Sequence, residues 1–172
     1  MEVRYGRLHN ASLTMIATGM AVVTVLRFIA RPETAPALSL GDPRFVLYAG
    51  LAAIMAFFAW LGAQRFADRR PQVVIDRDGI LLGFGRNKRF AWKDVQWVRV
   101  KRLALRPQLQ IGLAPEAFVA ADLRLTQWNI DDGLRPVKGM PATLMVRDNG
   151  LDRSAAAMLD AIKAFRPNLV ES

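Results

Sequence analysis

Two long apolar runs occupy the first third of the chain, at Ala11–Ala30 and Phe45–Ala63. Each holds about 20 residues, and an α-helix of that length, rising roughly 1.5 Å per residue, covers a hydrocarbon core near 30 Å. Arg27 is the only charged residue in the first run, and the second run has none. A surface helix of a soluble protein would carry polar residues in every turn. The pattern therefore predicts two membrane-spanning helices.

Two other interpretations of these runs remain open. Both could be buried helices in the core of a large soluble protein. Alternatively, the first run could be a cleaved signal peptide, since Arg4 and Arg7 precede it and Ala35-Pro36-Ala37 loosely resembles a cleavage site. The first run is longer than a usual signal core and a second run follows closely, so we expect two uncleaved spans.

Small residues recur at helical spacing within both runs. One stripe consists of Thr14, Ala17, Ala21 and Thr24, and the other of Ala49, Ala52, Ala56, Ala59 and Ala63. Small side chains let helices approach closely in lipid, so the stripes predict a packed hairpin or a seam for self-association. The alternative is a chain that is simply rich in alanine.

After Pro71 the pattern changes to short alternations of apolar and polar residues, which are typical of β-strands. We expect helices at Pro115–Ala121 and from an Asp152 N-cap to about Arg166, where Pro167 follows. A brief helical turn is expected at Lys93–Val95. The expected strands are Gln72–Asp76, Ile80–Gly83, Arg89–Trp92, Trp97–Lys101, Leu109–Leu113 and one within Met140–Arg147.

Four short motifs in this part of the chain occur in the same order in a known family. They are Asp76–Ile80, Trp92–Val95, Pro115-Glu116 and Gly139–Pro141. With the two apolar runs, this order resembles the bacterial two-span membrane proteins of unknown function that carry a C-terminal pleckstrin-homology-like domain. The resemblance implies a fold and a membrane location, and it supplies no activity or functional residues.

The predicted fold is therefore membrane α+β. A two-helix transmembrane hairpin in residues 1–70 precedes a small PH-like antiparallel sheet or barrel in residues 71–172, closed by the C-terminal helix.

Charge is concentrated in the segment that follows the second run. The chain has a net charge of +9, and residues 65–106 hold 12 basic and 4 acidic residues. Lys and Arg favour the cytoplasmic flanks of spans, so Arg4, Arg7, Arg65, Arg69 and Arg70 predict that both termini are cytoplasmic. Basic residues near an anionic leaflet also attract lipid headgroups. The candidate anionic-lipid contacts are Arg65, Arg69, Arg70, Arg86, Lys88 and Arg89. Solvated strand faces or a nucleic-acid surface would use the same charge, but no nucleic-acid recognition motif accompanies it, so we expect no nucleic-acid partner.

Residues that carry common chemistry are scarce. The chain has no cysteine and a single histidine, His9, which excludes thiol catalysis and, within one chain, His-based triads and paired-His metal sites. We expect no enzyme activity, cofactor or metal. Trp92, Trp97 and Trp128 could line a ligand groove or fill the core of the sheet.

The sequence thus predicts an uncharacterised, non-catalytic interaction module in the bacterial cytoplasmic (inner) membrane. Its expected partners are the lipid bilayer, anionic lipid headgroups, a protein or further copies of itself. The alternative function is an oligomeric small transport or channel component, for which Arg27 is the one intramembrane charge.

Overall fold

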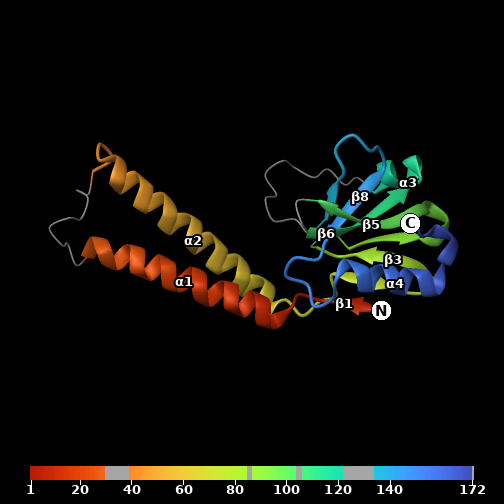
Figure 1. Cartoon of the computed structure of the whole chain (residues 1–172), viewed down its shortest axis with the longest axis horizontal. Helices are drawn as coiled ribbons and strands as arrows, with labels where there is room; N and C mark the ends of the chain where they lie inside the picture. The colour runs from red at the N-terminus through yellow and green to blue at the C-terminus, as the bar shows by residue number, and fades with distance from the viewer. Residues whose placement is uncertain (30–38, 85–86, 104–105, 122–133, 172) are drawn as a thin grey trace. The chain divides into compact units, whose positions relative to one another are not determined.

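The computed structural model describes residues 1–29, 39–84, 87–103, 106–121 and 134–171 (Figure 1). Arg86, Trp128 and the Ala35-Pro36-Ala37 motif lie outside the described residues. The chain forms two compact units, one made of residues 6–68 and the other of residues 1–5 together with 69–172. The first unit is therefore inserted into the second along the sequence.

The inserted unit is a hairpin of two long helices, α1 (Arg7–Ile29) and α2 (Pro43–Ala67). Helix α2 begins where Asp42 accepts a hydrogen bond from the backbone N–H of Arg44 at 2.9 Å. Pro43 stands in the first turn, where its missing N–H costs no helical hydrogen bond. The two helices pack side by side over much of their length (Figure 1).

The α1 stripe predicted from small residues is confirmed as the face that packs on α2. Ala17 and Thr24 are buried, and Thr14 and Ala21 are half-buried. Thr14 and Thr24 donate their hydroxyl hydrogens to the carbonyls of Asn10 and Met20, so neither hydroxyl is left without a partner beside the second helix.

Only two of the five residues in the predicted α2 stripe lie on the packed face of the helix. Ala52 and Ala59 are half-buried, whereas Ala49, Ala56 and Ala63 are exposed. The packed face of α2 instead contains larger residues at helical spacing between the alanines. It follows Phe45, Tyr48, Ala52, Met55, Ala59 and Gly62.

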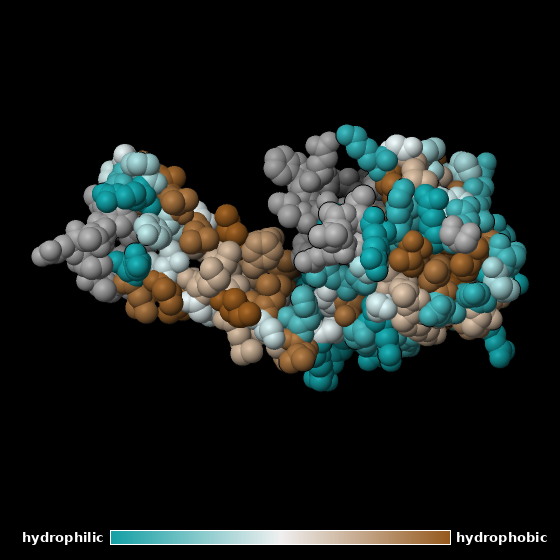
Figure 2. Space-filling view, in the orientation of Figure 1, coloured by the Kyte–Doolittle hydropathy of each residue, from teal (hydrophilic) through white to brown (hydrophobic). Residues whose placement is uncertain are grey.

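Both helices are long and apolar enough to cross a membrane, and most of their surface is exposed. Apolar residues follow them along their lengths (Figure 2). Of the exposed large apolar residues in the described chain, all except Leu40, Val119 and Phe165 belong to α1 or α2. A core helix of a soluble protein would instead be mostly buried.

The second unit contains two antiparallel sheets. The first has the order β1-β2-β3-β4, formed by Glu2–Val3, Val73–Ile75, Gly79–Leu82 and Lys88–Ala91. Strand β1 precedes the helical hairpin and β2 follows it, yet Val3 pairs with Val73 and Glu2 with Val74. No local pattern in the sequence predicts a strand at residues 2–3.

The second sheet has the order β5-β6-β8-β7. Its strands are Val95–Leu103, Arg106–Leu113, Thr143–Arg147 and Leu134–Pro136. The chain passes from the first sheet to the second through a short 3₁₀ turn, η1 (Trp92–Asp94). A short helix, α3 (Pro115–Ala120), follows β6.

The structure contains the predicted antiparallel strands and C-terminal helix, but the strands do not close into a barrel. In the described chain β4 pairs only with β3 and β5 pairs in a ladder only with β6, so the two sheets remain separate. At the β5 edge, Val170 forms an isolated parallel bridge with Val98 after the last 3₁₀ turn, η2 (Pro167–Leu169). The C-terminal segment, rather than β4, thus covers this edge.

The C-terminal helix α4 (Ala155–Phe165) packs against strands of both sheets. Its Met158 and Ile162 are fully buried in one apolar core with residues such as Ile75 and Ile111 from the two sheets. The predicted Asp152 N-cap is wrong, because Ser154 caps the helix by accepting from the Ala157 N–H at 3.2 Å.

Candidate functional site

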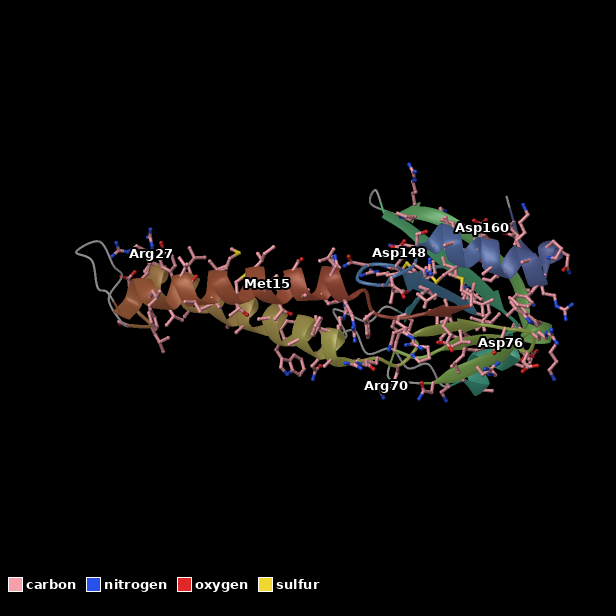
Figure 3. The ribbon with its side chains drawn as sticks, turned by 90° about the horizontal axis from the view of Figure 1, so that it is seen from below. Met15, Arg27, Arg70, Asp76, Asp148 and Asp160 are labelled. Carbon is pink, nitrogen blue, oxygen red and sulfur yellow. The ribbon has the colours of Figure 1, made fainter. Side chains whose placement is uncertain are left out.

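The first three predicted lipid contacts lie at the end of α2, and they differ in their exposure to solvent. Arg65 is buried, with 8% of its surface exposed, and lies in the last turn of the helix. Arg69 and Arg70 follow the helix and are exposed; Arg70 is labelled in Figure 3. Of these three predicted contacts, only Arg69 and Arg70 are exposed.

Lys88 and Arg89 lie on opposite faces of β4. Lys88 pairs with the fully buried Leu82, and Arg89 pairs with the half-buried Leu81. Directly paired residues share a face of the sheet, and successive residues alternate between faces. One flat surface such as a membrane cannot contact both side chains in the same way. Arg86, the third residue predicted at this turn, lies outside the described residues.

Arg89 is also occupied by an ion pair with Asp76. Its Nη1 lies 2.9 Å from each carboxylate oxygen of Asp76, which also accepts hydrogen bonds from the backbone N–H groups of Asp78 and Gly79. Partial desolvation raises the pKa of Asp76, but the hydrogen bonds from Arg89, Asp78 and Gly79 outweigh it and lower that pKa below its usual value. Arg89 therefore has a structural role in the β2–β3 turn.

A different set of polar residues shares one surface, which we call the polar face of the second sheet. It is the side of β5, β6 and β8 that points away from the apolar core. The pairing registers place on it Trp97, Arg99, Lys101, Gln108, Gln110, Thr143, Met145 and Arg147.

The middle of the polar face is held by contacts of Arg99. Its Nε donates to Gln110 Oε1 at 3.1 Å, and its guanidinium lies 4.7 Å from the centre of the Trp97 ring. Glu171 forms an ion pair with it at 3.5 Å. The Trp97 ring lies across Gly112, where any side chain would collide with it. These residues form a fixed structural cluster, because the cation already has aromatic, amide and carboxylate partners.

Next to this cluster, three polar residues form a row across three strands. Lys101 on β5 pairs with Gln108 on β6, which pairs with Arg147 on β8. Lys101 is exposed and Arg147 is half-buried. Gln108 is buried, with 7% of its surface exposed. The Gln108 Oε1 atom is buried and has no hydrogen-bond partner in the described part of the chain. This row combines two cations with a vacant acceptor.

Trp92 and Trp97, the two predicted groove residues that the structure describes, do not line a common groove. Trp92 lies in the core, stacked 6.4 Å from Phe165, and donates its indole hydrogen to the Asp76 carbonyl. Trp97 lies on the polar face. Trp128 lies outside the described residues.

In the described ranges of the chain, no group of three or more His, Cys, Asp or Glu side chains is placed to hold a metal ion. Two carboxylates near α4 have local roles instead. Asp148 accepts the Ala155 N–H at 2.9 Å, and Asp152 accepts the Arg4 N–H at 2.9 Å (Figure 3 labels Asp148).

Sequence reasoning missed the row of Lys101, Gln108 and Arg147. The alternation of valines with Arg99 and Lys101 places those two cations on one face of β5. Gln108 and Arg147 join them only through pairing registers, and nothing local in the sequence gives those registers. No family model, curated protein or solved structure matches this chain.

Proposed function

We propose that this chain is a membrane-anchored, non-catalytic binding module of the bacterial inner membrane. In this proposal α1 and α2 cross the bilayer, and the two-sheet unit lies in the cytoplasm. The unit binds anionic lipid headgroups or chemically related anions near the membrane surface.

The observation that carries the proposal is the pairing of β1 with β2. The chain leaves the sheet after Val3, forms both apolar helices, and returns to the same sheet at Val73. Since the backbone before α1 and the backbone after α2 belong to one folded unit, both must lie on the same side of a membrane that the hairpin crosses.

The distribution of cations supports a cytoplasmic side. Arg4 and Arg7 stand before or at the start of α1, and Arg65, Arg69 and Arg70 stand at or beyond the end of α2. Positive residues of this kind favour the cytoplasmic ends of spans. Together with the shared sheet, this argues that both termini are cytoplasmic.

The same strand pairing argues against a cleaved signal peptide. Cleavage at Ala35-Pro36-Ala37 would separate β1 from the rest of the chain. The sheet would then lose Val3, which is fully buried in the core, and would expose the edge of β2.

A PH-like fold for the second unit is part of the proposal. The antiparallel strands and the C-terminal helix packed on them support this assignment, although the strands form two separate sheets and not the single sheet or barrel that the family resemblance implies. In this assignment the helical hairpin is an insertion between the first two strands of the domain. Tethering would raise the effective concentration of the unit at the bilayer, so even weak headgroup contacts would be populated.

Single-cysteine labelling tests the proposed topology cleanly, because the chain has no cysteine of its own. Leu40→Cys, between the helices, should react with a membrane-impermeant maleimide in intact spheroplasts. Asn168→Cys, in the second unit, should react only after lysis. Carbonate washing should leave both variants in the membrane pellet. Equal labelling of the two sites in spheroplasts, or recovery of the full chain in the carbonate supernatant, would contradict the proposal.

A further inference from the structure

We infer that the row Lys101–Gln108–Arg147 on the polar face of the second sheet binds a phosphorylated polyol. This inference rests on the proposed binding function and assigns it a site and a ligand chemistry. None of the three residues belongs to the set of lipid contacts predicted from the sequence.

Strand pairing brings the three residues within reach of one small ligand. Directly paired residues on one face of an antiparallel sheet have Cβ atoms about 5 Å apart. Gln108 is paired on one side with Lys101 and on the other with Arg147, so the amide is flanked by two cations with long side chains. A phosphate group is the common anion that Lys and Arg bind together, Arg through its planar fork and Lys as a point charge.

The second observation is the vacant acceptor at Gln108. A buried polar atom without a partner costs free energy, and most such atoms in folded proteins are satisfied. Gln108 Oε1 is buried and lacks a partner in the described residues, although the side chain is more than nine-tenths buried. The two flanking residues carry donors, but neither donates to this oxygen. A ligand hydroxyl would supply the missing hydrogen.

The charge of the polar face favours an anion over a neutral sugar. Glu171 is engaged by Arg99 at 3.5 Å, at the neighbouring row. Lys101 is exposed, and its ammonium forms no ion pair in the described part of the chain. Lys101 is paired with Gln108 and exposed at the β5 side, so an anion held by its ammonium lies next to the Gln108 side chain. The ligand class is defined by two contacts. A phosphate group binds between the two cations, and a hydroxyl group donates a hydrogen bond to the Gln108 amide.

This chemistry has two sources, a free glycerol phosphate and the headgroup of phosphatidylglycerol. The experiment uses the purified full chain in neutral detergent, titrated with glycerol phosphate and followed by calorimetry. A second arm places the same chain in nanodiscs of phosphatidylcholine with or without phosphatidylglycerol, and measures protection of the Lys101 amine from acylation. Protection only in the nanodisc arm identifies the lipid, and calorimetric binding identifies the free ester.

Lys101→Gln should weaken binding about tenfold, as expected for the loss of a charge-assisted contact. Gln108→Leu should weaken it about fivefold, the usual value of one neutral hydrogen bond. Arg102→Gln is the matched control, because Arg102 is exposed on the same strand but pairs with Pro107 on the opposite face. It removes the same charge and should leave binding unchanged.

Gln108→Leu also has a readout that separates loss of the site from loss of the fold. Removing an unpartnered buried acceptor should raise the melting temperature of the ligand-free chain while lowering affinity. Absence of binding in both arms, an equal loss in Arg102→Gln, or full affinity in Gln108→Leu would overturn the inference. Recovery of the chain in the carbonate supernatant would instead overturn the membrane anchor, and the calorimetric arm would still report on the site.

Discussion

Gly62 lies where α1 and α2 approach each other closely. A Cβ at this position would lie 2.5 Å from Thr14 Oγ1 and 3.1 Å from the Asn10 carbonyl oxygen and the Thr14 nitrogen. The two 3.1 Å contacts are with backbone atoms, so side-chain rotation cannot relieve them. The close packing of the hairpin at this end therefore depends on glycine at position 62, which has no side chain.

Gly62→Ala should destabilise the hairpin by about 1–3 kcal/mol, the usual cost of overpacking a tight interface. Gly50→Ala is the matched control, because nothing lies within 4 Å of its added Cβ and alanine favours helix. Thermal unfolding of the full chain in detergent, followed by circular dichroism, measures the difference. A Gly62→Ala variant as stable as the control would show that α1 and α2 are not packed this closely.

Asp76 gives the β2–β3 turn a pH dependence. Partial desolvation raises the pKa of Asp76 in the folded chain. The combined effect of Arg89 and two backbone N–H groups is larger, so the pKa is lowered overall. A carboxyl group with a lowered folded-state pKa contributes stability above its unfolded pKa of about 4 and loses it as pH falls through the folded-state value. The effect should be modest, because both side chains are partly exposed.

Asp76→Asn should therefore lower the free energy of unfolding at neutral pH but not at pH well below about 4. Urea unfolding of the two proteins in the same detergent, at neutral and acidic pH, measures this difference. A stability gap that is the same at both pH values would assign the role of Asp76 to hydrogen bonding alone.

Strand β1 is the element that connects the helical hairpin to the sheet, and it is held from two sides. On one side Val3 pairs with Val73. On the other, Asp152 accepts the Arg4 N–H at 2.9 Å and donates its own N–H to the Arg4 carbonyl at 2.8 Å. The residue predicted to cap α4 instead fixes the chain just before α1.

Asp152→Ala should loosen β1 by about 1 kcal/mol, since it removes one hydrogen bond and leaves the backbone contact intact. Asp152→Asn keeps an acceptor oxygen and should behave nearly like the original chain. Hydrogen exchange at the Val3 and Arg4 amides, read by mass spectrometry of N-terminal peptides, should be faster only in the alanine variant. Equal exchange in all three proteins would argue that Asp152 does not hold β1.

Elements with a strong local pattern could be predicted from the sequence, and those that depend on distant pairing could not. The apolar runs gave both long helices, and the alternation around Val98 and Val100 gave β5. Strand β1 has only two residues, and it is a strand because it pairs with β2, which follows both helices in the sequence. The candidate site has the same origin, because Gln108 and Arg147 meet only through the register of β6 with β8.

At the scale of the whole molecule, the chain separates apolar and basic surface between its two units. Exposed large apolar residues concentrate on α1 and α2, and the basic excess begins at the end of α2 and continues through β5. Lipid favours the first kind of surface, and an anionic leaflet favours the second near its headgroups. The predicted basic cluster is nevertheless dispersed in the fold, since Arg65 is buried and Arg89 is bound to Asp76.

The insertion of the helices between β1 and β2 also determines the order in which the protein can assemble. During synthesis β1 leaves the ribosome first, but its partner β2 emerges only after both helices. The first sheet therefore stays incomplete until the hairpin has been made. Truncation before Val73 would therefore leave Val3 without its strand partner, so folding of the second unit depends on the synthesis of both helices.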